Sequence, residues 1–174
     1  MNVEQAFGIP IFSHTIENWS EHKDELIAML HTEDGDGHQT DYFKYHQFGE
    51  LPPYAEKLFE VLKPALDEFN DIYPHEFTIH NVWGQRYTRG GYHPLHNHGA
   101  LGYSAIVYAS LESDHQPTSF FAPYIDFIEG DVIEYVPEVK EGDIVFFPSA
   151  LMHQCKAVQS DSERVVFSFN IRNA

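Results

Sequence analysis

The chain is poor in cysteine and in long apolar runs. One of its 174 residues is a cysteine, Cys155, so an intramolecular disulfide is excluded and a reducing compartment is favoured. No apolar run approaches the roughly 20 residues that span a bilayer, and the first residues lack the basic and apolar segments of a signal peptide. We therefore expect a cytoplasmic, intracellular protein without a membrane partner.

Basic side chains are scarce as well. Lysine and arginine total 10 against 27 aspartates and glutamates, which gives a formal net charge of −17 at pH 7. Such a charge repels phosphate backbones, so we expect no nucleic-acid partner. The chain does have a hydrophobic fraction of 43% and an aromatic fraction of 15%, enough for a packed core, together with 12 histidines. So many histidines in so acidic a chain require a chemical explanation.

Hydrophobic patterning divides the chain near residue 75, and we expect one domain over residues 1–174. Residues 1–75 predict a short strand at Ile9–Ile16 and a helix from Ser20, as its N-cap, to about Leu30. A second helix follows, because apolar residues repeat at 3.6-residue spacing from Leu51 to Ile72. We expect both helices to support the rest of the domain by packing on a sheet.

In residues 76–174 the apolar residues repeat with period two instead. The strand-like runs are short and are separated by Gly, Pro and acidic turns; they cover residues 77–87, 102–110, 119–128, 132–136, 143–148, 153–158 and 164–170. This pattern predicts a mainly β fold, a jelly roll or double-stranded β-helix of around eight strands, as in cupins. The N-terminal helices are expected to pack on one of its sheets.

Three histidines crowd the segment that follows Gly90. His96 and His98 point to the same face of an extended strand, with Cα atoms about 6–7 Å apart, and two such imidazoles can bind one cation. His93 has the opposite parity and would need a bulge to join them. The alternative is a chance cluster of surface histidines. The histidines outside these motifs are expected to be ordinary surface residues: His14, His22, His31, His38, His46, His75 and His115.

A third ligand and a cation follow later in the chain. Gly142–Pro148 predicts a turn that leads into an apolar strand, and His153 comes directly after it, where the chain can return beside the first histidines. Arg164 opens the next apolar strand. An arginine there is costly unless it meets an anion or a partner carboxylate. A salt bridge with one of the many acids is the alternative for Arg164.

The order of these residues resembles the Fe(II)/2-oxoglutarate-dependent oxygenases, and most closely their prolyl-hydroxylase-like branch. In that branch a Tyr is followed by a Gly three residues later and by the first histidine ligand nine residues later. Tyr87, Gly90 and His96 match this string. The opening segment Phe7–Phe12 is also similar to small oxygenases of bacteria and tailed phages. The resemblance covers residues 76–170.

The resemblance implies a dioxygenase that binds Fe(II) and uses 2-oxoglutarate and O2 as co-substrates. It implies hydroxylation of a protein substrate of the prolyl type, such as a peptidyl proline, or of a small molecule. The catalytic metal ligands would be His96, His98 and His153.

The resemblance also implies a binding site for 2-oxoglutarate. Arg164 would bind the distal carboxylate, since a guanidinium pairs with a carboxylate in a fixed, bidentate geometry. Tyr87 would donate a hydrogen bond to the same carboxylate. Asn81 and Gln85 share a strand face with Tyr87, so we expect them to line the same cavity.

One ligand departs from the family's pattern and leaves two other functions open. The family normally has Asp or Glu where this chain has His98, and a three-histidine site lacks one negative charge. Gly90 with His96 and His98 also resembles the first cupin motif, which suggests a metalloenzyme that does not use 2-oxoglutarate. The other alternative is a non-catalytic barrel that binds a metal or ligand. A homodimer paired through edge strands is a further expectation.

Overall fold

The computed structural model describes residues 8–32, 36–46 and 48–174. Residues 1–7 of the expected domain, which include Phe7 of the segment similar to small oxygenases, lie outside the described residues. The helices are α1 (Trp19–Ala28), α2 (Tyr42–His46) and α3 (Ala55–Ile72). The strands are β1 (Phe12–Thr15), β2 (His38–Thr40), β3 (Phe77–Tyr87), β4 (His93–His96), β5 (Tyr103–Ser110), β6 (Ser119–Ile125), β7 (Val132–Tyr135), β8 (Asp143–Pro148), β9 (Met152–Cys155) and β10 (Arg164–Asn173).

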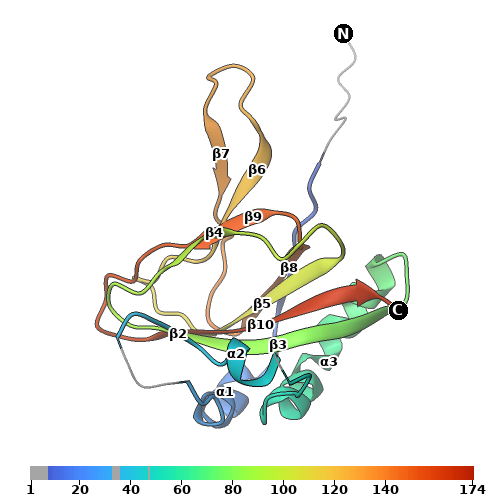
Figure 1. The fold of residues 1–174 in the computed structure, drawn as a ribbon, viewed down its shortest axis with the longest axis vertical. Helices are drawn as coiled ribbons and strands as arrows, with labels where there is room; N and C mark the ends of the chain where they lie inside the picture. Colours follow the sequence, from blue (N-terminus) through green and yellow to red (C-terminus); the bar gives the residue numbers. More distant parts are fainter. Residues whose placement is uncertain (1–7, 33–35, 47) are drawn as a thin grey trace.

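The strands form two antiparallel sheets. The larger sheet has six strands in the order β1-β8-β5-β10-β3-β2, and the smaller has four in the order β4-β9-β6-β7. The smaller sheet covers one face of the larger, and the β6–β7 hairpin extends away from the barrel (Figure 1). The predicted jelly roll is therefore confirmed.

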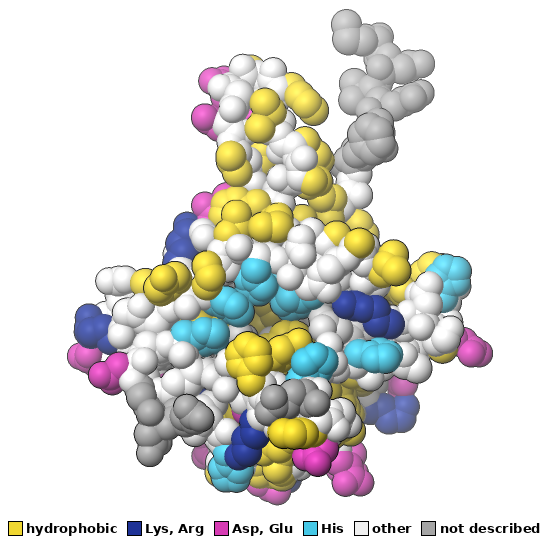
Figure 2. Space-filling view, viewed as in Figure 1, with side chains coloured by type: hydrophobic (Ala, Val, Ile, Leu, Met, Phe, Trp, Pro, Cys, Tyr) yellow, Lys and Arg dark blue, Asp and Glu magenta, His cyan; other side chains and the backbone are white. Residues whose placement is uncertain are grey.

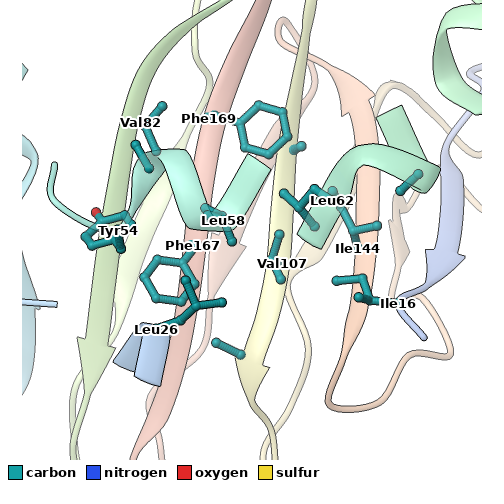
Figure 3. Close-up of a cluster of buried hydrophobic side chains, with 14 of the residues drawn as sticks. Ile16, Leu26, Tyr54, Leu58, Leu62, Val82, Val107, Ile144, Phe167 and Phe169 are labelled. Carbon is teal, nitrogen blue, oxygen red and sulfur yellow. The ribbon is translucent and has the colours of Figure 1, made fainter. Parts of the chain in front are cut away.

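Helices α1 and α3 cover the other face of the large sheet (Figure 1). Apolar side chains of the two layers meet in one core, in which Leu58 and Leu62 of α3 and Phe167 and Phe169 of β10 are almost fully buried (Figure 3). Because side chains alternate along a strand, Val166 of β10 faces a second core between the sheets. The helices thus pack on one sheet, as predicted, and the interior face of that sheet is left for a site.

Two local features differ from the predictions. Helix α1 begins at Trp19, after Asn18 in a left-handed conformation (φ 54°), so Ser20 lies in the first turn and is not the N-cap. Strand β2 and helix α2 were not predicted, because three and five residues are too few to show a periodicity. In the described part of the chain, no helix combines the length and apolar character needed to cross a membrane.

Candidate active site

Three histidines converge between the two sheets. His96 ends β4 and is paired in register with His153 of β9, while His98 lies two residues beyond the end of β4. The ring centroids are 4.3 Å apart for His96 and His153, and 4.9 Å apart for His98 and His153. One ligand nitrogen from each residue lies within 4.8 Å of the other two, a spacing that allows all three to hold one metal ion.

Backbone carbonyls fix the tautomer of two of these histidines. The Nδ1 atom of His96 is 2.7 Å from the carbonyl oxygen of Pro94, and that of His153 is 2.9 Å from the carbonyl oxygen of Leu151. Because a carbonyl oxygen can only accept a hydrogen bond, Nδ1 carries the proton in both rings. Each Nε2 atom therefore keeps a lone pair that can bind a metal.

A side-chain network does the same for His98. Its Nδ1 atom is 2.8 Å from the hydroxyl of Ser104 and 3.1 Å from the amide oxygen of Asn170. Ser104 also donates to Asn170 at 2.7 Å and contacts the hydroxyl of Ser149 at 2.8 Å. The proton again lies on Nδ1, so all three rings present Nε2 to the same point.

Burial keeps these rings neutral at physiological pH. It lowers the pKa of His153 to about 3 and that of His98 to about 4, and it lowers the pKa of His96 as well. Neutral imidazole is the form that binds a metal. Three neutral nitrogen donors suit a divalent first-row metal such as Fe(II), so the residues present fit an iron centre.

A narrow inner chamber of about 20 Å³ connects the histidines with Arg164, the first residue of β10. The Arg164 side chain is 1% exposed, and it donates from Nη1 to the Cys155 sulfur (3.0 Å) and from Nη2 to the Thr118 hydroxyl (3.1 Å). Its Nε atom has no partner, and no carboxylate of the described residues pairs with it. The salt-bridge alternative is therefore not found in the described structure. A buried guanidinium with neutral partners is a strong binding site for an anion.

Aromatic rings support this guanidinium. Its central carbon lies 5.0 Å from the ring centroid of Tyr87 and 5.7 Å from that of Tyr108. Burial raises the pKa of Tyr87, so its hydroxyl stays protonated and can donate a hydrogen bond. Tyr87, Arg164 and the three histidines all line the inner chamber. Sequence reasoning did not identify Thr118 and Tyr108, because their proximity to Arg164 depends on strand pairing.

An outer chamber of about 420 Å³ opens from the same histidines to solvent. Gln85 lines both chambers, and its amide nitrogen lies 3.2 Å from His38 Nε2 and 3.1 Å from His93 Nδ1. Asn81 lines the outer chamber, and the inner chamber does not include it. The reason is a register shift between β3 and β10, at which Asn81 adopts a left-handed conformation with φ 51°.

Two further histidines, His93 and His38, join this cluster, although the sequence did not place them in it. The pairing of β4 with β9 shifts register between His93 and His96, which is the bulge expected for His93. The His93 ring therefore stacks on the His96 ring, with centroids 4.0 Å apart. His38 stacks on Tyr87 at 4.6 Å and lines the outer chamber, so the prediction of a surface residue was wrong. The short strand β2 positions it, and no pattern in the sequence indicated that strand. Figure 2 shows histidines gathered at the centre of one face.

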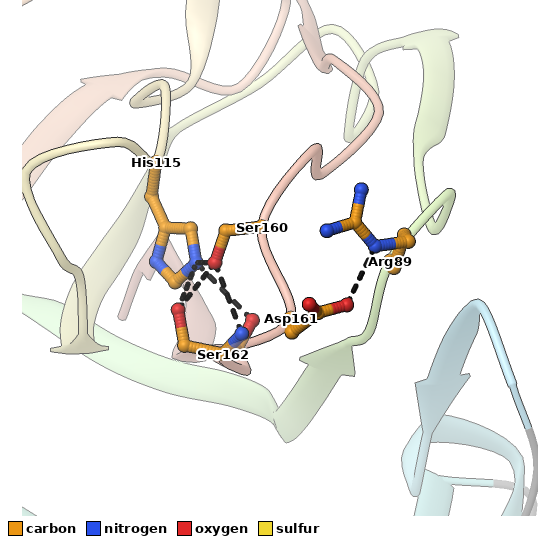
Figure 4. A network of polar contacts seen from close by, with 5 residues as sticks. All are labelled: Arg89, His115, Ser160, Asp161 and Ser162. Carbon is orange, nitrogen blue, oxygen red and sulfur yellow. Dashed lines mark hydrogen bonds and ion pairs between the residues drawn. The ribbon is translucent and has the colours of Figure 1, made fainter.

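His115 was also wrongly predicted to lie on the surface. It is 6% exposed, and its Nε2 atom is 3.3 Å from the Ser160 hydroxyl and 3.2 Å from both the hydroxyl and the carbonyl oxygen of Ser162 (Figure 4). An ion pair between Arg89 and Asp161, 2.7 Å long, holds the same loop from the other side. These contacts fix the segment that leads directly into β10 and Arg164.

The jelly roll, the histidine cluster and the buried arginine together define a non-haem metal oxygenase. The chain belongs to the 2OG-Fe(II) oxygenase family, since the family model described as "Putative 2OG-Fe(II) oxygenase" matches residues 81–170, just over half of the chain. The resemblance stated from the sequence is thus confirmed, and Fe(II) and 2-oxoglutarate are the cofactor and co-substrate of this family. None of the curated proteins compared with the chain matches it.

Solved structures with the same fold have low sequence identity. HygX from Streptomyces hygroscopicus, solved with nickel and 2-oxoglutarate, is 15% identical, with a TM-score of 0.67 over 95% of this chain and 84% of that one. The viral collagen prolyl hydroxylase of Paramecium Bursaria Chlorella virus-1 is 16% identical, with a TM-score of 0.63 over 94% and 96% of the two chains. A Pseudomonas putida prolyl-4-hydroxylase is also 16% identical, with a TM-score of 0.61 over 95% and 94%.

Proposed function

We propose that this oxygenase holds Fe(II) with His96, His98 and His153 and binds the distal carboxylate of 2-oxoglutarate with Arg164. The observation that carries the proposal is the unpaired guanidinium of Arg164, which lines the same buried chamber as the three histidines. Cupin-type enzymes that do not use 2-oxoglutarate have no need of such a cation, so Arg164 favours the 2-oxoglutarate reaction over that alternative.

The protein's own residues would orient the co-substrate. Bound iron supplies the activation of O2 that couples oxidative decarboxylation of 2-oxoglutarate to hydroxylation. Arg164 fixes one end of the dicarboxylate through charge-assisted hydrogen bonds, and the Tyr87 hydroxyl adds a donor to the same group. Because both side chains are almost fully buried, water competes weakly with these contacts.

His98 changes the charge of the proposed centre. Three neutral imidazoles leave the full positive charge of the metal, whereas a carboxylate at this position would reduce it by one unit. The hydrogen bonds from His98 Nδ1 to Ser104 and Asn170 select the tautomer that carries its proton on Nδ1 and hold the ring in place. We therefore propose that His98 occupies the place of the family's usual carboxylate ligand.

The outer chamber is the proposed place of the primary substrate, which we take to be a peptidyl proline or a small molecule. The viral and Pseudomonas structures are those of prolyl hydroxylases, and one structure of HygX contains hygromycin B. An intracellular location stays part of this proposal because the single cysteine, Cys155, is a buried free thiol.

Anaerobic titration with Fe(II) and 2-oxoglutarate tests the proposal, with the weak visible metal-to-ligand charge-transfer band as the signal. We expect the band with the wild type and with Arg89→Ala, whose guanidinium pairs with a surface carboxylate, and its loss with Arg164→Ala. Iron binding without the band in the wild type would contradict the proposal and favour the cupin-type alternative. Absence of tight divalent-metal binding would favour a non-catalytic barrel.

A further inference from the structure

No carboxylate of the described residues lines either chamber, although the chain carries 27 acidic residues. The residues that line the outer chamber are His38, Thr40, Tyr42, Phe43, Asn81, Trp83, Gln85, His93, His96, Asn97, His98, Asn170 and Arg172. In Figure 2 the acidic side chains lie toward the edges of the face on which the histidines gather. The described lining of the two chambers is therefore neutral to positive in an otherwise strongly negative molecule.

Arg172 supplies the only formal charge among these lining residues. It donates from Nη1 to the Ser149 hydroxyl and the Ile171 carbonyl oxygen, and from Nη2 to the His98 carbonyl oxygen, each at 3.0 Å. All three acceptors are neutral. No described carboxylate forms an ion pair with Arg172, and its Nε–H and second Nη2–H have no protein partner among the described residues.

These contacts hold the guanidinium close to the metal site. Gly102, at φ 77°, approaches so closely that a Cβ atom there would lie 3.0 Å from Arg172 Nη1 and 2.1 Å from the carbonyl oxygen of Ile171. Arg172 is therefore a half-buried cation that is fixed by the backbone around it and open to the outer chamber. Fixed donors with no counter-charge are what an anionic ligand requires.

We infer that Arg172 binds a carboxylate of the primary substrate in the outer chamber. The inference deepens the proposed function and rests on it, since that function makes this chamber the substrate's place. One guanidinium matches one carboxylate, and replacement of a metal-ligand carboxylate by His98 adds positive charge on the same side of the chamber.

The rest of the chamber indicates the substrate's other half and its size. The aromatic side chains Tyr42, Phe43 and Trp83 line it, with Tyr42 in edge contact with each of the other two rings. An apolar or ring-bearing group would pack on this wall. Because Arg172 is the one cationic side chain among the outer chamber's lining residues, it matches a small monoanionic carboxylic acid with an apolar body.

Matched acid and amide probes test the inference by calorimetry. The probes are N-acetyl-phenylalanine, N-acetyl-leucine and N-acetyl-proline with their amides, titrated into metal-free protein and into protein loaded with Ni(II) and 2-oxoglutarate. In the wild type we expect at least one acid to bind about tenfold more tightly than its amide, as loss of one charge-assisted hydrogen bond implies. Arg172→Gln should remove this preference and leave the 2-oxoglutarate affinity within about twofold. Arg89→Gln is the matched control and should change neither.

Other outcomes separate the possible sources of the carboxylate. If Arg172→Gln instead weakens 2-oxoglutarate binding, the residue serves the co-substrate and the inference is overturned. Equal binding of acids and amides by the wild type, or no binding of any probe, also overturns it. Should Arg172→Gln not fold, Arg172→Lys is expected to fold and to retain a reduced preference, and an unchanged preference would contradict bidentate binding. If the wild type takes up no 2-oxoglutarate, the proposed function fails, and the metal-free titration alone decides whether the anion site exists.

Discussion

Two arginines lie in β3 or just after it, and two lie in the neighbouring strand β10, but the two pairs differ in the charge of their contacts. Arg86 and Arg89 pair with carboxylates of Glu163 and Asp161, at 2.9 and 2.7 Å, whereas Arg164 and Arg172 of β10 contact only neutral groups. The difference teaches that position within the barrel, not net charge, decides which cations are available to a ligand. Acids neutralise the outer arginines, and no described carboxylate lines the two chambers, which leaves the inner two arginines for anions.

Substituting the buried arginine should have the largest effect on function. We expect Arg164→Met to lower 2-oxoglutarate affinity about 100-fold or more, because loss of a buried charged partner costs about 2–5 kcal/mol. The same substitution should raise the stability of the metal-free protein, since it removes an uncompensated buried charge. Calorimetry on Ni(II)-loaded protein and chemical denaturation measure the two quantities.

Arg86→Met provides the opposite case in the same sheet. This change removes an ion pair whose glutamate is half exposed and a hydrogen bond to the Ile27 carbonyl oxygen, so it should lower stability by about 1–2 kcal/mol and leave co-substrate affinity unchanged. If Arg86→Met and Arg164→Met shifted stability in the same direction, the contrast between outer and inner arginines would be lost.

Metal affinity should depend on the number of ligands and on their charge. His153→Ala removes a buried nitrogen donor and should weaken Fe(II) or Ni(II) binding about 10- to 100-fold or more, as judged from losses at supporting residues of metal sites. His98→Asp should retain or increase iron affinity, because it restores a negative ligand. Loss of metal with His98→Asp equal to that with His153→Ala would argue against His98 in the carboxylate position.

The histidine cluster should make stability depend on pH. The folded-state pKa values of His98 and His153, about 4 and 3, lie below the unfolded value, so the unfolded chain binds more protons as the pH falls below about 6.5. The free energy of unfolding of the metal-free protein should therefore decrease from pH 6.5 to 4, as measured by urea denaturation. His75→Gln, at an exposed position, should leave this slope unchanged, and a flat profile in the wild type would contradict the burial of the rings.

The loop that leads to Arg164 should show a moderate effect. His115→Ala removes hydrogen bonds to Ser160 and Ser162 and should cost about 1–2 kcal/mol of stability, with a decrease in 2-oxoglutarate affinity of about threefold (Figure 4). Arg89→Ala, which breaks only an exposed ion pair in the same loop, should cost less than about 1 kcal/mol. Equal effects of both variants would show that His115 does not position this segment.

Periodic patterns predicted the parts of the fold that extend over several residues. Strands β3, β5 and β8 and helix α3 follow the patterns closely, since each buries one or both faces of a long element. Order and spacing also predicted that His96, His98 and His153 lie together. The role of Arg164 stays a proposal, which the family resemblance suggested.

The remaining site residues depend on contacts that one-dimensional patterns do not contain. His38 lies on a three-residue strand that pairs with β3, and this pairing brings it to the cluster. Its contact there, Gln85, is 47 residues further along the chain. His93 joins the cluster through a bulge. Its position in the sequence showed that a bulge would be needed, but not that one is present. Arg172 had no motif, because what distinguishes it is that no described carboxylate pairs with it, which only the folded chain shows.

Calorimetric comparison of 2-oxoglutarate with 2-oxopentanoate tests the central claim most directly, because the two ligands differ only in the distal carboxylate. With Ni(II)-loaded protein we expect the wild type to bind 2-oxoglutarate about 100-fold more tightly and Arg164→Met to bind both ligands with equal, weak affinity. Equal affinities in the wild type, or a preference that survives in Arg164→Met, would contradict the claim that the unpaired interior arginine holds the co-substrate.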